Sequence, residues 1–170
     1  EIKYKIKRLN PFCGDPFKYV LKTDLTEQYN FQNTFIKPIK NFLKGDFFST
    51  RYQSLLINGH QTPAILFDKK NEALYKIKNI IHLEVEKYLD HFKESKEGFI
   101  KFWPKSYKIS AWLVSMKSGG KIQPHMHEHG WLSGSIYINV PPKLEINSGN
   151  LIVSTDDQEV KTKKNINQKI

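Results

Sequence analysis

The clearest pattern of apolar and polar positions lies between residues 71 and 93. Apolar side chains recur there at intervals of three and four, which puts them on one stripe of a helix with charged residues opposite. The stripe consists of Leu74, Ile77, Ile81, Val85, Tyr88 and Phe92. We therefore expect a helix over 71–93 whose stripe packs against a sheet.

A shorter helical pattern covers residues 33–44, with Asn33 as a plausible cap and Gly45 as a plausible stop. Its apolar positions are Phe35, Ile39, Phe42 and Leu43. Pro38 weakens this prediction, because a proline inside a helix removes a hydrogen bond and kinks the chain. Upstream, the turn formers of residues 10–16 predict an ordered loop.

After Gly98 the helical period gives way to alternation, which is typical of β-strands. Ser118, Gly119 and Gly120 predict a turn, and the pair Pro141-Pro142 ends a strand because proline cannot donate to a ladder. The predicted strands cover residues 107–116, 121–125, 131–140 and 150–154.

The order of helices first and antiparallel strands afterwards predicts an α+β, mainly β fold. Residues 1–98 are expected to form a helical support region, and residues 99–170 a barrel or jelly-roll core. With 170 residues and 39% hydrophobic content, the chain can bury one core of ordinary size. We therefore expect a single domain over 1–170.

The net charge of +10 would favour nucleic acid, an anionic membrane surface or an acidic substrate. The lysines are spread along the chain, however, and the run at 161, 163 and 164 lies in a polar tail without stacking aromatics, so a solvated surface is the better interpretation. The chain has one cysteine and no long apolar run, and the basic start Glu1–Arg8 does not resemble a signal peptide. A cytoplasmic location is therefore the default expectation.

Three of the six histidines fall within five residues, at His125, His127 and His129. Residues two apart in an extended strand point to the same face, so His125 and His127 can converge on one ion. Neutral imidazole suits iron, zinc, copper and nickel, which indicates a transition metal without naming it.

A merely exposed histidine-rich loop, or hydrogen-bonded histidines at a barrel mouth, would give the same spacing. The position of the cluster, after a strand and a Gly-Gly turn and before another strand, favours an open metal site at a barrel rim. His60, His82 and His91 lack such context, and the last two are expected at the surface of the predicted helix.

The stretch 118–141, SGGKIQPHMHEHGWLSGSIYINVP, resembles the 2-oxoglutarate and iron(II) oxygenases that often occur fused to tetratricopeptide repeats. The shared pattern is a Gly-Gly turn, His-x-His, Leu-Ser-Gly, a tyrosine and an aliphatic-Pro ending. Supporting similarities are the Gly-x-Gln-Thr element at 59–62, the opening loop at 10–13 and the turn and strand at 148–151.

This resemblance implies a double-stranded β-helix, cupin-like, holding iron(II) through His125 and His127 with 2-oxoglutarate bound beside the metal. The wider superfamily uses two histidines and one carboxylate, whereas His127 stands where the carboxylate is usual. Glu128 is adjacent, but it would point to the opposite face of a regular strand. An all-imidazole site carries more positive charge, which puts turnover in doubt more than binding.

The family also carries a distal histidine and an arginine that binds the far carboxylate of 2-oxoglutarate. This sequence has no histidine after His129 and no arginine after Arg51. We therefore expect that the sequence is truncated at its C-terminus and that the missing strands would supply both residues.

If the predicted strands 121–125 and 131–140 pair across the rim, Tyr137 alternates in register with His125 and His127, and its hydroxyl could bind a carboxylate of 2-oxoglutarate. Trp112, by packing, and Gln123, by hydrogen bonding, could line the same pocket, although each of these residue types is more often structural. Ser133 and Gly134 are expected to allow close approach of strands, and Gly119 and Gly120 to form a turn with positive φ.

The function implied is a dioxygenase that oxidises 2-oxoglutarate to succinate and hydroxylates an unidentified substrate. One rival is a non-catalytic, cupin-like barrel that binds zinc or nickel through the same residues. A second rival, a basic module that binds nucleic acid, needs lysines clustered on one face with exposed aromatics, and no such cluster occurs outside the tail.

Overall fold

The computed structural model describes residues 12–45, 50–143, 145–154 and 167–169. The chain divides into two compact units. Unit 1 comprises residues 1–24, 84–106 and 140–170, and unit 2 comprises residues 25–83 and 107–139. The predicted basic start and the lysine run of the tail lie outside the described residues. The single-domain assignment stays a prediction.

The long helix predicted over 71–93 is confirmed as α2 (Glu72–His91). It begins where the Asn71 side chain accepts a hydrogen bond from the backbone N–H of Leu74, 3.0 Å away, which satisfies one of the unpaired donors of the first turn. Residues 72–83 of α2 belong to unit 2 and residues 84–91 to unit 1.

The second predicted helix is also confirmed, as α1 (Lys37–Lys44) preceded by a π-helical turn (Gln32–Ile36). Pro38 lies at the start of α1, where its missing N–H is tolerated, and the wider turn before it changes the bonding pattern without breaking the helix. Gly45 ends α1 as predicted. The cap assignment was wrong by one turn, because Asn30 and not Asn33 supplies the capping oxygen.

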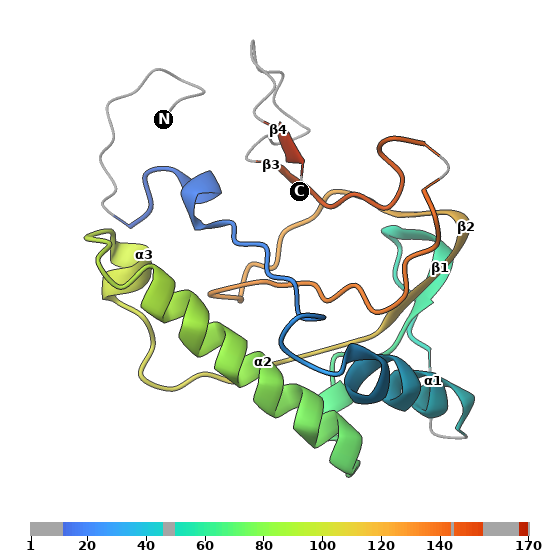
Figure 1. Ribbon diagram of the computed structural model, residues 1–170. Coiled ribbons are helices and arrows are strands. Elements are labelled where there is room, and N and C mark those ends of the chain that lie inside the picture. The colour runs from blue at the N-terminus through green and yellow to red at the C-terminus, as the bar shows by residue number, and fades with distance from the viewer. Residues whose placement is uncertain (1–11, 46–49, 144, 155–166, 170) are drawn as a thin grey trace. The chain divides into compact units, whose positions relative to one another are not determined.

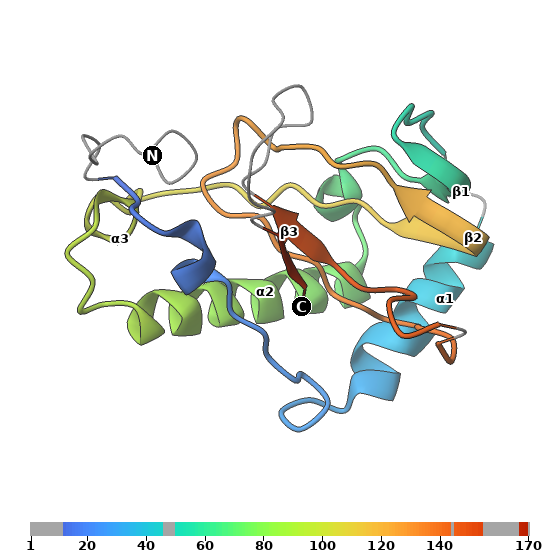
Figure 2. The same ribbon diagram turned by 90° about the horizontal axis from the view of Figure 1, so that it is seen from above.

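The core of unit 2 lies between these helices and an extended segment. Phe35 and Ile39 pack against Leu74, Ile77 and Ile80 of α2, together with Leu66 and Phe67 from a 3-10 helix (Leu66–Asp68). Ile109, Ala111 and Leu113 cover this core from the segment 107–113, which is extended but not part of a strand ladder. The expected sheet over the helical stripe is therefore not observed in unit 2, where this segment and Ile138 cover the core without a strand ladder. Figure 2 shows the segment as the yellow trace that leads into β2.

The sheet of unit 2 has two antiparallel strands, β1 (Leu56–Gln61) and β2 (Val114–Ile122), which lie side by side in Figure 1. The pairing shifts between Ile57, opposite Lys121, and Gly59, opposite Met116. Residues 117–120 bulge out at this shift. The predicted Gly-Gly turn is thus a bulge inside one strand, with φ of 73° at Gly119.

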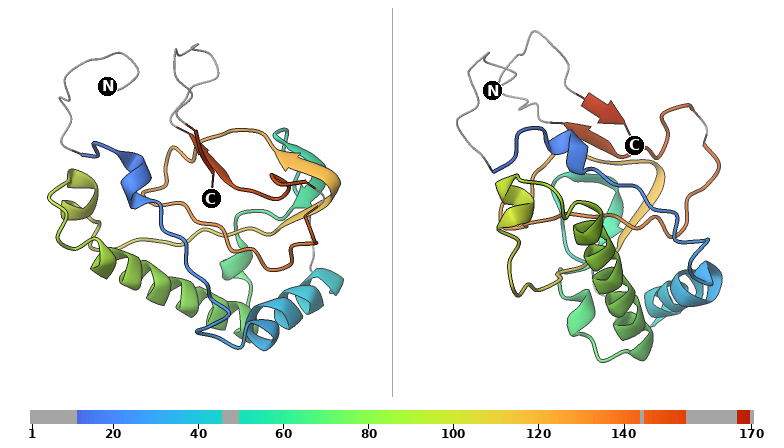
Figure 3. Two further views of the ribbon diagram at one scale, coloured as in Figure 1. Left: turned by 45° about the horizontal axis from the view of Figure 1, so that its top comes forward. Right: turned by 60° about the vertical axis from the view of Figure 1, so that its left-hand side comes forward.

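Unit 1 has a smaller core of Tyr88, Phe99 and Ile100, with Cys13, Tyr19 and Trp103 among the partly buried residues around it. Its elements are a 3-10 helix (Pro16–Tyr19), α3 (Gly98–Lys101) and the paired strands β3 (Ile152–Ser154) and β4 (Asn167–Lys169), seen as two arrows in Figure 3. The expected ordered loop is confirmed for residues 12–16, where the backbone N–H of Gly14 donates a hydrogen bond to the side-chain carboxylate of Glu97. Residues 10 and 11 lie outside the described part.

Several strand predictions were wrong. Residues 131–140 form no strand, residues 123–125 lie beyond the end of β2, and β1 falls within the region expected to be helical. Gly134 has nothing within 4 Å of an added Cβ, so it does not serve a close approach. The fold is a mixed α/β arrangement with small antiparallel two-stranded sheets in the described residues, and the double-stranded β-helix stays a prediction.

Candidate metal centre

The segment that carries the histidine pair starts where β2 ends. The backbone N–H of Gln123 donates to the carbonyl of Leu55, at 2.8 Å, and fixes the start of the segment on the neighbouring chain. Pro124 has no N–H and biases Gln123 toward extended backbone. The chain then turns at 127–130, where Gly130 N–H donates to the His127 carbonyl at 2.9 Å. The sequence thus keeps residues 123–127 out of a helix.

The structure brings His125 and His127 together. Their Nε2 atoms lie 3.1 Å apart and their ring centroids 5.0 Å apart. His125 is exposed and His127 is partly buried. The expected convergence of the two rings is observed, although the segment that carries them is not paired in a ladder.

The orientation of the His125 ring follows from its neighbour. Its Nδ1 lies 2.8 Å from the carbonyl oxygen of Gln123, which can only accept, so this nitrogen carries the hydrogen. With the hydrogen on Nδ1, the Nε2 atom of His125 is left to face the Nε2 atom of His127. A backbone carbonyl that orients a histidine in this way is typical of metal-binding imidazoles.

His127 is held from the other side by Trp112. The two rings are stacked, with centroids 5.2 Å apart and planes inclined by 7°. Burial, followed by the proximity of His125, lowers the pKa of His127 below its ordinary value. A lowered pKa favours the neutral ring, which is the form that binds a metal.

The spacing of the two nitrogens fits a shared ion. Two imidazole nitrogens bound at right angles to one ion, at about 2.1 Å each, lie about 3.0 Å apart. The observed 3.1 Å is close to this separation, and it is also the length of a hydrogen bond between the two rings. Within the described residues no group of three or more histidine, cysteine, aspartate or glutamate side chains could hold a metal ion. The described part of the chain therefore offers the two imidazoles as candidate ligands and no third one beside them.

The other predicted site residues are placed differently. Gln123 contributes through its backbone carbonyl, whereas a side-chain contact was expected. Tyr137 lies in the irregular stretch after the histidines and about half of its side chain is exposed, although partial burial still raises its pKa. Because residues 131–140 form no strand, the cross-strand register expected for Tyr137 does not exist.

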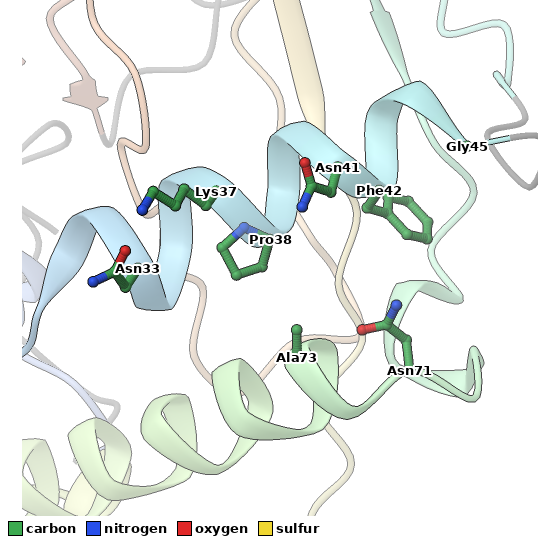
Figure 4. Close-up of a pocket in the computed structure, with 8 residues that line it drawn as sticks. All are labelled: Asn33, Lys37, Pro38, Asn41, Phe42, Gly45, Asn71 and Ala73. Atoms are coloured by element: carbon green, nitrogen blue, oxygen red, sulfur yellow. The ribbon is translucent and has the colours of Figure 1, made fainter.

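Figure 4 shows a separate groove between α1 and the beginning of α2. It has a volume of about 400 Å³, and it is lined by Asn33, Lys37, Pro38, Asn41, Phe42, Gly45, Asn71 and Ala73. Its only ionisable side chain is that of Lys37, and it contains none of the predicted site residues. The candidate chemistry therefore stays with the histidine pair.

Thr62 is a residue whose role the sequence did not reveal. Its motif, Gly-x-Gln-Thr, was noticed only as a similarity, yet the side chain is 4% exposed and hydrogen-bonds to the residue next to Trp112. A threonine directly after a strand gives no signal of this kind by itself.

Comparison with known proteins agrees with the motif. Residues 110–169, about a third of the chain, match the family model described as "Putative 2OG-Fe(II) oxygenase". The match includes Trp112, both histidines of the pair and Tyr137, and it confirms the family resemblance. Searches of the curated proteins and of the solved structures found no match.

Proposed function

We propose that this protein is an iron(II)- and 2-oxoglutarate-dependent dioxygenase, with His125 and His127 as metal ligands. The family match supports an oxygenase at the level of the family. The observation that carries the residue assignment is the 3.1 Å approach of the two Nε2 atoms, with His125 oriented by the Gln123 carbonyl. In this proposal the core of the protein is a double-stranded β-helix.

When bound, iron(II) and 2-oxoglutarate supply the oxidative decarboxylation that is coupled to hydroxylation of a substrate C–H bond. The chain's own residues bind and orient. His125 and His127 would present their Nε2 atoms to the metal, and Trp112 covers one face of the His127 ring against water. Tyr137 and Gln123 remain the proposed contacts for 2-oxoglutarate.

The ligand assignment is tested by anaerobic titration of the protein with iron(II) and 2-oxoglutarate. We expect the weak visible absorption band of the chelated complex in the wild type and its loss in His125→Ala. His129→Ala is the matched control, because this histidine is exposed, lies two residues beyond the pair and should leave the band intact. A band that survives His125→Ala would remove His125 from the site.

Release of succinate distinguishes the dioxygenase from a non-catalytic metal-binding barrel. The dioxygenase predicts succinate formation from 2-oxoglutarate that depends on both iron(II) and His125. Stable binding of iron(II), zinc or nickel with no succinate at any 2-oxoglutarate concentration would instead favour the non-catalytic barrel.

A further inference from the structure

Trp112 is the aromatic residue stacked on a proposed metal ligand, and its own position is fixed by the backbone on both sides. The carbonyl of Ala111 accepts from the N–H of Leu66 at 3.1 Å, and the carbonyl of Leu113 accepts from the N–H of Thr62 at 3.0 Å. Neither Trp112 backbone neighbour can move without breaking one of these bonds.

The Thr62 side chain completes this arrangement. Its Oγ1 accepts from the N–H of Leu113, at 3.0 Å, and donates to the carbonyl of Pro63, at 3.3 Å. The side chain is 4% exposed, so water cannot replace either partner readily. A buried backbone N–H that loses its acceptor carries the full cost of desolvation.

These contacts form a continuous chain from Thr62 through Leu113 and Trp112 to His127. A nearly parallel stack restrains rotation of the imidazole out of its plane, and the ring plane decides where Nε2 points. A backbone carbonyl orients the ring of His125. Within the described residues, no such carbonyl contact is seen for either ring nitrogen of His127.

We propose that Thr62 and Trp112 are positioning residues that hold the His127 ring in its ligand orientation. Thr62 acts through the Leu113 backbone, and Trp112 acts by direct stacking. The inference rests on the proposed metal site, but the stack itself exists without a metal and can be measured separately. It also changes the role expected for Trp112 from contact with 2-oxoglutarate to support of a ligand.

The first test measures binding of cobalt(II) alone by titration calorimetry. Trp112→Leu should raise the dissociation constant about 2- to 10-fold, which corresponds to the usual strength of an aromatic pair. Thr62→Val, which keeps the shape but removes the acceptor, should weaken binding in the same range. Trp112→Phe and Thr62→Ser should each restore most of the affinity, and exposed Thr50→Val is the control.

The second test reads the stack in the metal-free protein. In histidine side-chain NMR spectra, the indole ring current should shift the ring protons of His127 and leave those of His129 unaffected. Trp112→Leu and Thr62→Val should each move the His127 signals. Should Thr62→Val fail to fold, Trp112→Leu still tests the stack, and Thr62→Ala, which also removes Oγ1, tests the threonine.

The outcomes separate the two proposals. Wild-type protein that binds no cobalt(II) or iron(II) would contradict the metal site. Displaced His127 signals in Trp112→Leu and Thr62→Val would still support the positioning role of Thr62 and Trp112. Trp112→Leu and Thr62→Val variants that bind cobalt(II) like the wild type and leave the His127 signals unchanged would overturn the positioning role of these two residues, whatever the activity.

Discussion

At the scale of single residues, the backbone decides the role of several side chains. Asn58 has φ of 50° and Gly119 has φ of 73°, and both lie at the register shift between β1 and β2. Gly120 serves a different purpose, because an added Cβ would lie 2.8 Å from the Lys117 carbonyl and 2.9 Å from the Asn58 carbonyl. The two adjacent glycines of the motif are therefore required for different reasons.

Gly120→Ala should destabilise the protein by about 1–3 kcal/mol, because the methyl group forces two backbone carbonyls apart. Gly134→Ala is the matched control, since open space surrounds its Cβ position, and its effect should stay within about 0.5 kcal/mol. Urea unfolding of both variants measures the difference. Equal stability of the two variants would show that the bulge opens without strain.

At the scale of elements, α2 depends on the burial of its apolar stripe. Leu74 is 1% exposed and lies in the core of unit 2, whereas Leu83 on the same helix is 50% exposed. Periodicity predicted the helix and most of the stripe correctly. It missed Ile80, which is buried in the core of unit 2. The buried face of α2 is wider than the single stripe of six apolar positions that the spacing defined.

Leu74→Ala should lower the free energy of unfolding by about 2–5 kcal/mol, as expected for a large-to-small change in a packed core. Leu83→Ala removes the same atoms from an exposed position and should change it by less than about 0.5 kcal/mol. Thermal and urea unfolding followed by circular dichroism at 222 nm measure both. A similar loss in the two variants would contradict the packing of α2 described above.

At the scale of the whole molecule, the chain carries a net charge of +10, and the ion pairs seen in its described part are local. The ion pairs of the described residues include Lys87 with Glu84, at 2.7 Å, and Lys93 with Asp90, at 3.0 Å, both on the surface. Such exposed pairs contribute little to stability. Within the described residues, no helix is both long and apolar enough to cross a membrane.

The alkaline stability of the protein depends on Tyr88. Burial first, then the neighbouring Tyr19 and Cys13, raise the pKa of Tyr88 from 10.0 to about 12. Its hydroxyl donates to the Tyr19 carbonyl at 2.7 Å. Because the folded protein holds this proton more tightly than the unfolded chain, the contribution is complete below pH 10.0 and is lost as the pH rises toward about 12.

We therefore expect the stability advantage of the wild type over Tyr88→Phe to be constant up to about pH 10 and to shrink between about pH 10 and 12. Unfolding by urea at several pH values measures it, with Tyr75→Phe, at an exposed position, as the control. An advantage that grew with pH would contradict the direction of the shift.

The sequence by itself determined both helices, the ordered loop before them, the family resemblance and the convergence of His125 and His127. The helices, the loop and the convergence depend on local rules, namely helical period, turn chemistry and the two-residue repeat of extended backbone. The resemblance depends on the motif of residues 118–141. Only the tertiary structure decided that 131–140 forms no strand, that 56–61 pairs with β2 and that Thr62 lies behind Trp112. Strand pairing and burial depend on contacts between residues far apart in the chain, and the local spacing of apolar and polar residues does not predict such contacts.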